Sequence, residues 1–580
     1  MKRSFIILFL MLLFNLPIMA TVFSDSYLKY EINGDTAIVK GYTSLPEDGH
    51  LVIPSTVDYS DKTYQVTTVK AYAFQDCIEL KSVIIPTSIR NIERYAFVNC
   101  INLNTIDILD SNEGIRIDET AFEDAPITSA KIGRDFASKI FYEHKTLKEV
   151  IFGPYITSIR DNYFNHCKTL QSVSAPNVET IGIKAFFYCE SLLSIDCPKV
   201  TRVLNMAFDG CQKLGKIFLP NVLAIHKDAF CLTGITELDI PSVESIGESA
   251  FSSCSKLITV KMPKVTNLGR SAFSSCRSLK TIELPRVTKI PVSAFQYCDS
   301  LNIVSLSDSL KMIENSAFEE CKSLKSIYIP NSCYNIGNSV FKKCSSLQSV
   351  HLPSELSTIS KDLFATCKSL TILDASNTQV GRIFESAFAG CSSLISIILP
   401  MTLHTIDANV FSGDTNLETI VGLDSVAYLS ACGLEKTKWY SNQIKDNKVI
   451  IGKAFYRYEG TIEDNNFVVP EGIVCLSDNA LRGQNFKTIQ FPSSLKRIGD
   501  HALSDCQQLA ILTIPANVIK IGKIDNCASL SSLRIYGDSS SYNSYVSSIT
   551  NTPIKTLYIN RITYGFSKIT TISRLTIGPL

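Results

Sequence analysis

A cysteine that recurs at a nearly fixed interval constrains the fold of this chain more than any other feature. Fourteen of the 19 cysteines stand three residues after an aromatic or aliphatic residue, and most neighbouring pairs of them are 21 to 24 residues apart. The larger gaps of 43, 67 and 115 residues are close to two, three and five times that interval. A short fixed period is the signature of a solenoid, in which each repeat is one turn of a coil. The 450 residues from Cys77 to Cys527 therefore predict about 21 turns, called rungs below. The cysteines of this ladder are Cys77, Cys100, Cys167, Cys189, Cys211, Cys254, Cys276, Cys298, Cys321, Cys344, Cys367, Cys391, Cys506 and Cys527.

Each rung begins with a short apolar pattern, which the rung of Leu279 shows well. Leu279, Ile282 and Leu284 follow the pattern L-x-x-I-x-L. The alternation at its end predicts a strand with one buried face, called the first strand below. Pro285 follows directly and ends this strand, because its nitrogen carries no hydrogen for a neighbouring strand.

The second half of the rung predicts another short extended segment and then a turn. Val287–Ile290 supplies the extended segment, called the second strand below. In several sister rungs a glycine such as Gly182 comes next, and we expect it to adopt a positive φ. Ala294, Phe295 and Cys298 follow at the spacing of a single helical turn whose buried face points inward. The other glycines at this position are Gly247, Gly269, Gly337, Gly499 and Gly522.

One rung is too small to bury its own apolar side chains, so stability requires stacked copies that share a core. The phenylalanine before each ladder cysteine is the largest inward residue and should fill that core. This row therefore predicts a continuous core that the stacked rungs share. Its members are Phe74, Phe97, Phe122, Phe164, Phe186, Phe208, Phe230, Phe251, Phe273, Phe295, Phe318, Phe341, Phe364, Phe388 and Phe411.

The full consensus, L-x-x-I-x-I-P-x-x-V-x-x-I-G-x-x-A-F-x-x-C, resembles the BspA-like type of leucine-rich repeat. The resemblance covers about residues 66–535, and copies such as Leu80–Cys100 and Leu324–Cys344 carry most of the motif. It implies an α/β leucine-rich-repeat solenoid, curved, with about 21 rungs of 22 to 24 residues. Parallel β-sheet would line the concave face and short helical turns the opposite side. The resemblance also implies an exported bacterial protein, often at the cell surface, that adheres to host proteins or other cells.

The chain divides by pattern into five segments. Residues 1–20 form a basic start and an apolar run that ends near Ala20, which predicts a secretory signal peptide. The expected location is therefore secreted or at the cell surface, with the periplasm as an alternative. The remaining segments are an N-terminal β-rich cap at 21–65 with a hairpin turn around Gly34, regular repeats at 66–411, irregular repeats with a hairpin insertion at 412–470, and C-terminal repeats at 471–580, degenerate after 535.

The sequence offers no motif for catalysis, a cofactor or a metal ion. The seven histidines are scattered, no C-x-x-C pair exists, and no glycine-rich phosphate loop is present. Lys plus Arg number 56 against 55 acidic residues, so nucleic acid is not an expected partner. No later apolar run is long enough to span a membrane. We expect the ladder cysteines to be mostly free thiols that fill the core, although equivalent residues of stacked rungs would be close enough for disulfides.

The residue between the last two inward positions of each first strand should face the concave surface. This row mixes acids, bases and aromatic residues, which favours a binding surface over a merely solvated one. Drift on an unselected surface remains the alternative. The row comprises Phe152, Ser174, Asp196, Phe218, Asp239, Lys261, Glu283, Ser305, Tyr328, His351, Asp374 and Ile398. Its candidate partner-binding residues are Phe218, Asp239, Lys261, Glu283, Tyr328, His351 and Asp374.

A second group of candidates lies in the irregular segment. Trp439 and Tyr440, with Phe455, Tyr456 and Tyr458 nearby, could anchor a partner or could pack the insertion onto neighbouring rungs. The first functional hypothesis is a non-enzymatic protein that binds a protein partner, such as a host extracellular protein, through the concave sheet or the insertion. The alternatives are a structural surface element that associates with itself without a specific ligand, and a glycan-binding module.

Overall fold

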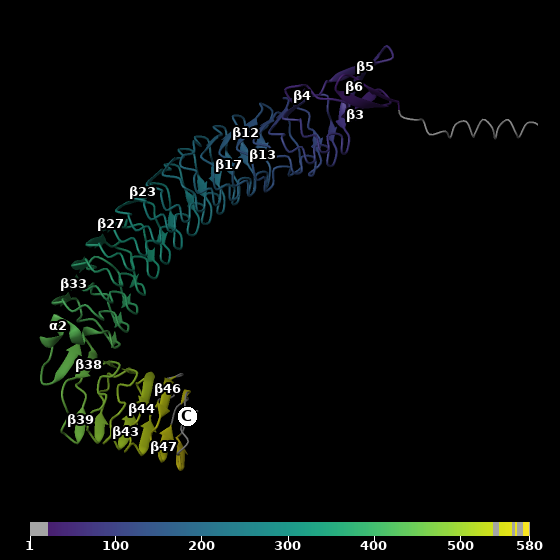
Figure 1. The fold of residues 1–580 in the computed structure, drawn as a ribbon. Helices are drawn as coiled ribbons and strands as arrows, with labels where there is room; N and C mark the ends of the chain where they lie inside the picture. Colours follow the sequence, from purple (N-terminus) through teal and green to yellow (C-terminus); the bar gives the residue numbers. More distant parts are fainter. Residues whose placement is uncertain (1–20, 538–543, 560–562, 565–571, 579–580) are drawn as a thin grey trace, which may run out of the picture. The chain divides into compact units, whose positions relative to one another are not determined.

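The computed structural model describes residues 21–537, 544–559, 563–564 and 572–578 (Figure 1). The chain divides into two compact units, Met1–Met262 and Pro263–Leu580. The predicted signal peptide at 1–20 lies outside the described residues. The five segments predicted from the repeat pattern stay a prediction.

The chain forms a β-solenoid of about 21 turns with parallel sheets, as the repeat predicted. It contains very little helix, whereas the expected α/β solenoid would have had a short helical turn in each rung. Within each unit, successive rungs stack so that first strands pair with first strands and second strands with second strands (Figure 1). The pairing keeps equivalent residues opposite each other: Tyr328, for example, is opposite His351. The register stays constant although the repeat length varies from 21 to 24 residues, because a one-residue slip would turn the apolar side chains outward.

Unit 1 starts with antiparallel strands that cover the first rung. Asn33 pairs with Thr36 across the turn at Gly34, which confirms the predicted hairpin. These strands are β1 (Val22–Ser24), β2 (Leu28–Asn33), β3 (Thr36–Tyr42), β5 (Thr56–Tyr59) and β6 (Lys62–Val69). The first strands are β4 (His50–Val52), β7 (Ser82–Ile85), β9 (Thr105–Ile108), β11 (Ser129–Ile132), β12 (Glu149–Phe152), β14 (Ser172–Ser174), β16 (Ser194–Asp196), β19 (Glu237–Asp239) and β21 (Thr259–Lys261). The second strands are β8 (Asn91–Ile92), β10 (Arg116–Ile117), β13 (Ser158–Ile159), β15 (Thr180–Ile181), β17 (Arg202–Val203), β18 (Ala224–Ile225) and β20 (Ser245–Ile246).

Unit 2 repeats the same design around one irregular segment. Its first strands are β23 (Thr281–Leu284), β25 (Ile303–Leu306), β27 (Ser326–Tyr328), β29 (Ser349–His351), β31 (Ile372–Asp374), β33 (Ser396–Ile398), β35 (Thr419–Val421), β39 (Asn466–Val468), β41 (Thr488–Gln490), β43 (Ile511–Ile514), β45 (Ser532–Ile535), β47 (Thr556–Ile559) and β49 (Arg574–Ile577). Its second strands are β22 (Asn267–Leu268), β24 (Lys289–Ile290), β26 (Met312–Ile313), β28 (Asn335–Ile336), β30 (Thr358–Ile359), β32 (Arg382–Ile383), β34 (Thr405–Ile406), β36 (Tyr428–Leu429), β38 (Ala454–Tyr458), β40 (Cys475–Leu476), β42 (Arg497–Ile498), β44 (Lys520–Asp525), β46 (Ser544–Thr550) and β48 (Thr563–Tyr564). The irregular segment contains the 3₁₀ helix η1 (Leu434–Lys436), the helix α2 (Lys438–Ser441) and β37 (Lys448–Ile451), which pairs antiparallel with β38.

The segment that ends each rung is a series of tight turns, where the sequence suggested a single helical turn. In one rung the amide of Cys298 donates to the carbonyl of Phe295, and Ser293 and Tyr297 have φ angles of 56° and 62°. Residues with positive φ cannot continue a right-handed helix. The amide of Phe295 instead donates to the carbonyl of Ala317 in the next rung, 2.8 Å away. The turn segments are therefore joined from rung to rung, as the strands are.

The phenylalanine row fills the core as the sequence predicted. All fifteen side chains are buried, and rings of successive rungs lie nearly parallel to each other. The ring centroids of Phe74 and Phe97 are 4.8 Å apart, and those of Phe388 and Phe411 are 5.9 Å apart. Such offset stacking adds to the free energy gained from burying the rings.

The glycines after the second strand correct another expectation. Gly182 does not have a positive φ; a Cβ added there would lie 2.7 Å from the backbone of Arg160 in the preceding rung. Gly247, Gly337, Gly499 and Gly522 are in the same situation. Glycine is used here because adjacent rungs approach too closely for a side chain, and the positive φ angles belong to other residues of the turn.

A buried arginine replaces the second strand of one rung, in a region where the repeat pattern is weak. Arg134 is fully buried, and no second strand lies between β10 and β13. Its guanidinium group donates five hydrogen bonds to backbone carbonyls, which belong to Pro86, Thr87, Ile89, Glu113 and Gly114. Burial lowers the pKa of Arg134. The five carbonyl dipoles compensate the buried charge, and the side chain joins two preceding rungs.

Candidate binding face

The outward side chains of the first strands form the candidate face, and their role in binding stays a prediction. In β19, for example, Leu238 points into the core while Glu237 and Asp239 are exposed. Each first strand thus contributes two outward positions, and the second of them is the predicted row. In unit 1, Ser174, Asp196, Asp239 and Lys261 take this position, and in unit 2, Glu283, Ser305, Tyr328, His351, Asp374 and Ile398. Phe218 takes the equivalent place in a rung whose first segment is not a strand. We call these side chains the first-strand row.

The predicted row is wrong at one position, where the outward residue is one place earlier in the sequence. Phe152 is buried, and Ile151 is the exposed side chain that pairs with Ser174. Phe152 is followed by Gly153 and not by the usual proline, which obscures the end of the strand in the sequence. The aromatic ring therefore belongs to the core, where it contacts Phe164.

Phe218 is the most exposed aromatic side chain of the row in unit 1. It is 64% exposed and lies in a shallow hollow of about 600 Å³. No strand forms at 214–219, so Lys216 and Phe218 extend from a strand-free segment of their rung. Asp239 and Lys261, which line the same hollow, are paired across β19 and β21. The hollow therefore combines one large apolar ring with side chains of both charges.

Tyr328 and His351 form the corresponding feature of unit 2. Tyr328 is 58% exposed, and its ring stacks on that of His351 with the centroids 4.4 Å apart. The Nδ1 atom of His351 lies 3.2 Å from the carbonyl oxygen of Ile329 and must therefore carry a hydrogen to bond with it. Asp374, from the neighbouring strand β31, completes a hollow of about 400 Å³ beside the pair.

The carboxyl group of Asp374 is held in its charged form. Hydrogen bonds from Ser376, including that of the Ser376 amide over 2.9 Å, lower its pKa. A carboxylate that accepts hydrogen bonds is stabilised relative to the protonated acid. Asp374 thus gives the hollow a fixed negative charge at neutral pH.

The sequence reasoning missed the first outward position of each strand. Ile303 and Ile372 take this position and are each 57% exposed. Lys216 and Glu237 take the same position in unit 1 and line the hollow around Phe218. The two-residue alternation of a strand could have revealed them, because they stand two residues before the predicted row.

The aromatic residues of the irregular segment lie inside the molecule. Trp439 and Tyr440 are only 9% and 5% exposed, and Phe455 and Tyr456 are buried as well. The hydroxyl of Tyr440 bonds to the carboxylate of Glu459, and its ring contacts that of Tyr456 edge to face. This burial favours the packing interpretation and leaves these rings unavailable to a partner.

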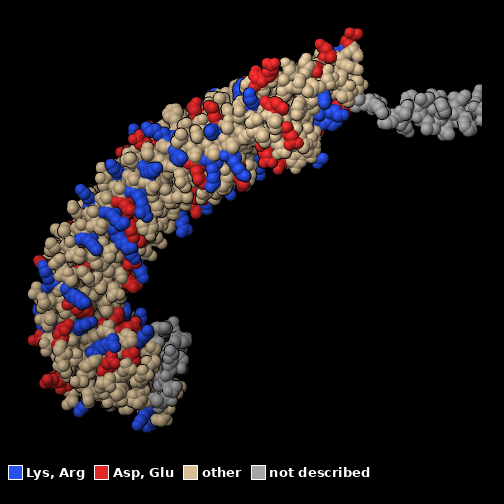
Figure 2. Space-filling model, viewed as in Figure 1, with Lys and Arg blue, Asp and Glu red and all other residues tan. Residues whose placement is uncertain are grey.

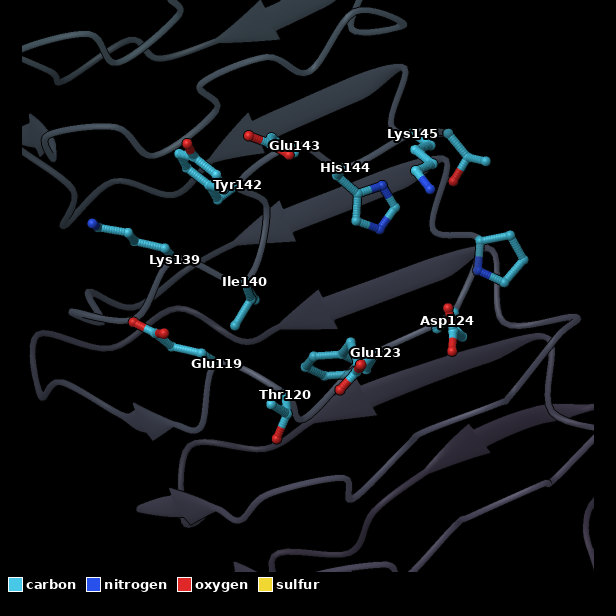
Figure 3. A pocket seen from close by; sticks show the side chains of 14 residues that line it. Glu119, Thr120, Glu123, Asp124, Lys139, Ile140, Tyr142, Glu143, His144 and Lys145 are labelled. Carbon is cyan, nitrogen blue, oxygen red and sulfur yellow. The ribbon is translucent and has the colours of Figure 1, made fainter.

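A third hollow, of about 480 Å³, lies where the ladder of phenylalanines and cysteines is interrupted. Side chains of two successive turns, 119–126 and 139–146, line it (Figure 3). His144 stands here at the position of a ladder cysteine, and its Nδ1 atom is buried with no hydrogen-bond partner. Burial lowers the pKa of His144 to about 4, against a smaller opposing effect of the Ala125 backbone. The imidazole is therefore neutral at physiological pH.

The ladder cysteines have a structural role that the sequence alone did not define. The thiol of Cys344 donates to the carbonyl of Phe318 in the preceding rung, with Sγ and O 3.2 Å apart. The same contact occurs throughout both units, for example from Cys189 to Phe164 and from Cys367 to Phe341. Burial raises the pKa of these thiols, to about 12 for Cys100, so they stay protonated donors. Among the described residues, no group of three or more His, Cys, Asp and Glu side chains could hold a metal ion.

Charges on the visible face are interspersed. Figure 2 shows Lys and Arg side chains next to Asp and Glu side chains along the rungs, with no extended region of one sign. Ion pairs also join adjacent rungs, such as Lys343 with Glu320 and Arg382 with Asp407. In the part of the chain that the structure describes, no helix is both long enough and apolar enough to cross a bilayer.

Comparison with known proteins identifies the repeat. The sequence matches the family described as BspA type leucine rich repeat region over residues 59–138, 134–242, 223–348, 311–438 and 448–573. Among solved structures, a leucine-rich repeat protein from Bacteroides ovatus is 21% identical, with 89% of this chain and 99% of that chain covered and a TM-score of 0.32. A leucine rich cell surface protein from Faecalibacterium prausnitzii is 24% identical, with 69% and 94% covered and a TM-score of 0.29.

The pneumococcal vaccine antigen PcpA is 13% identical, with 97% of this chain and 99% of that chain covered and a TM-score of 0.19. No curated protein matches the chain. These identities concern the fold alone. The family match, in contrast, extends over more than half of the sequence and coincides with the stacked rungs. The chain therefore belongs to the BspA-type leucine-rich repeat family.

Proposed function

We propose that this chain is an exported, non-catalytic protein that binds a protein partner through its first-strand row. The observation that carries the proposal is the exposure of Phe218 and Tyr328 in shallow hollows on that row. Large aromatic side chains cost free energy when they stay in water, and they are enriched where proteins contact each other. Export rests on the signal-like segment at 1–20, and adhesion at a cell surface is the setting that we propose for the binding.

The row suits a protein partner better than a carbohydrate or another copy of the chain. Its exposed aromatic side chains have charged neighbours: Asp239 and Lys261 lie beside Phe218, and Asp374 lies beside Tyr328. Such a mixture gives a partner both apolar contact and charges that select its orientation. A carbohydrate surface would be expected to present several flat rings in series, whereas here Tyr328 is stacked on a single histidine.

The test is to replace Phe218, Tyr328 and His351 together by alanine and to measure capture of purified host extracellular proteins and polysaccharides by the full chain. We expect the triple variant to lose capture of the protein partner that the original chain binds, while its melting temperature stays that of the original chain. A control variant removes Tyr155 and Tyr334, which are equally exposed but lie off the row. Capture that survives the triple replacement contradicts the proposal, as does capture of polysaccharides alone.

Sedimentation of the purified chain separates binding from self-association. A structural element that assembles with itself should form larger species as its concentration rises, without any ligand. We expect a single species over the same range, because the proposal assigns the row to a different protein. Concentration-dependent assembly that the triple replacement abolishes would assign the row to a second copy instead.

A further inference from the structure

We infer that the hollow beside Tyr328 and His351 is a pocket for an arginine side chain of the protein partner. The inference rests on the proposed function and names the chemistry that this part of the row selects. Its starting point is the absence of any Lys or Arg among the residues that line the hollow, on a surface where charges of both signs are otherwise mixed. Asp374 is the single Asp, Glu, Lys or Arg side chain among the residues that line the hollow.

The outward positions of the neighbouring strands extend this pattern within unit 2. From β23 to β35 the outward residues at both positions include two carboxylates, Glu283 and Asp374, and no Lys or Arg. The remaining outward residues are small hydroxyl residues, His351 and apolar side chains such as Ile303 and Ile372. A face with acidic and apolar groups but no cation is complementary to a cationic partner.

The acceptors of the hollow are arranged for a group that only donates. Because the Nδ1–H of His351 donates to the carbonyl of Ile329, the tautomer that makes this bond has its lone pair on Nε2, where an external donor can reach it. The Asp374 carboxylate and the side chain of Asn377 add oxygen acceptors to the same lining. A guanidinium group has five N–H donors and no acceptor, and it pairs readily with a carboxylate.

The aromatic pair selects a planar cation over a compact one. Tyr328 is held by its stacking on His351, which fixes the orientation of both rings and limits the entropy lost on binding. Tyr328 is still 58% exposed in this stacked arrangement, and both rings line the hollow together with Asp374. Arginine stacks on aromatic faces while it donates hydrogen bonds from its edge, which lysine cannot do.

The experiment uses the full chain and two small probes, N-acetyl-arginine amide and its uncharged isostere N-acetyl-citrulline amide. Saturation-transfer NMR detects weak binding of such probes to a large protein. We expect the arginine probe to bind and the citrulline probe to bind at least about fivefold more weakly. Asp374→Asn and Tyr328→Ala should each weaken the arginine probe by about two- to fivefold. The matched controls Asp424→Asn and Tyr334→Ala alter exposed residues outside the hollow and should leave binding unchanged.

Equal binding of the two probes, or equal effects of the hollow variants and their controls, overturns the inference. That outcome is distinct from a failure of the proposed function. If the triple replacement abolishes capture of a protein partner while the probes do not discriminate, the row binds a partner without an arginine anchor. If the arginine probe binds the hollow and no protein is captured, the pocket is real and the proposed function is wrong.

Discussion

At the scale of single residues, the positions where the cysteine ladder is interrupted are the most informative. Asp414 stands three residues after Phe411, at the place of a ladder cysteine, and is 1% exposed. Burial raises its pKa to about 8, against the opposing effect of the backbone amides of Cys391 and Gly390. An acid replaces a thiol that would have been neutral, so the cost of keeping it inside depends on pH.

We predict that Asp414→Cys abolishes a loss of stability that the original chain shows as the pH rises. Between about pH 4 and pH 8 the folded chain keeps the proton of Asp414 while the unfolded chain has released it. The free energy of unfolding therefore falls with rising pH across this window and is fully retained only below it. At pH 8 the variant should be more stable by a few kcal/mol, at roughly 1.4 kcal/mol for each unit of pKa shift. Urea unfolding at pH 4, 6 and 8 measures this, and equal differences at all three values would contradict it.

His144 should act in the opposite direction. Its pKa of about 4 lies below the usual value of a histidine, because burial disfavours the charged ring. Stability from the neutral imidazole is present above about pH 6.5 and is lost as the pH falls toward 4, since only the unfolded chain is protonated there. We predict that His144→Cys removes about 2 kcal/mol of acid sensitivity, allowing for its partial exposure. Hydrogen exchange of residues 139–146 at pH 4.5 and 7.5 measures the local effect; the same protection ratio in both proteins would refute it.

At the scale of the structural element, the side chain of Arg134 links its rung to two preceding rungs by hydrogen bonds, in a rung that has no second strand. We predict that Arg134→Met destabilises its rungs by about 3 kcal/mol or more, because several buried carbonyl groups lose their donors at once. Arg134→Lys should recover only a small part, since an ammonium group cannot reach five carbonyls in one plane. Hydrogen exchange of the amides at 87–90 and 113–117 provides the readout. The control is Arg160→Met, which breaks only an exposed pair with Asp135 and should cost less than about 1 kcal/mol. Similar costs for the two variants would mean that Arg134 is not a structural bridge.

Some structural elements of a rung could be predicted from the sequence, and others could not. The first and second strands and the inward phenylalanines followed from periodicity, because one repeat is enough to define which positions face the core. The turn segment did not, since inward residues at i, i+1 and i+4 fit both a helical turn and a tight turn with positive φ, as at Ser293. The role of Gly182 needed the backbone of the neighbouring rung, and the five acceptors of Arg134 come from two earlier rungs.

For the candidate face as well, the sequence predicted some features and not others. The outward row followed from strand alternation, except where Phe152 lacks the proline that marks the end of the strand. Stacking of Tyr328 on His351 depends on the register of β27 and β29, and the hollow beside them depends on their side-chain conformations. The burial of Trp439 depends on how an irregular segment packs, for which the repeat gives no template.

At the scale of the whole molecule, each unit is stable only through the contacts between its rungs, since no rung encloses a core by itself. Most ladder thiols contribute to these contacts, because they donate to a carbonyl of the preceding rung, as Cys344 and Cys367 do. Of the 19 cysteines, Cys231 is the one that is not fully buried. An oxidised ladder would replace these rung-to-rung bonds with disulfides and could not retain the same contacts.

Thiol titration without reductant tests the stacked, thiol-lined core most directly. In the folded chain we expect at most about one cysteine to react, and the reactive residue should be Cys231. After unfolding in guanidinium chloride, nearly all of the 19 thiols should react. Reaction of many ladder cysteines in the folded chain, or of fewer than half of all cysteines after unfolding, would contradict the account.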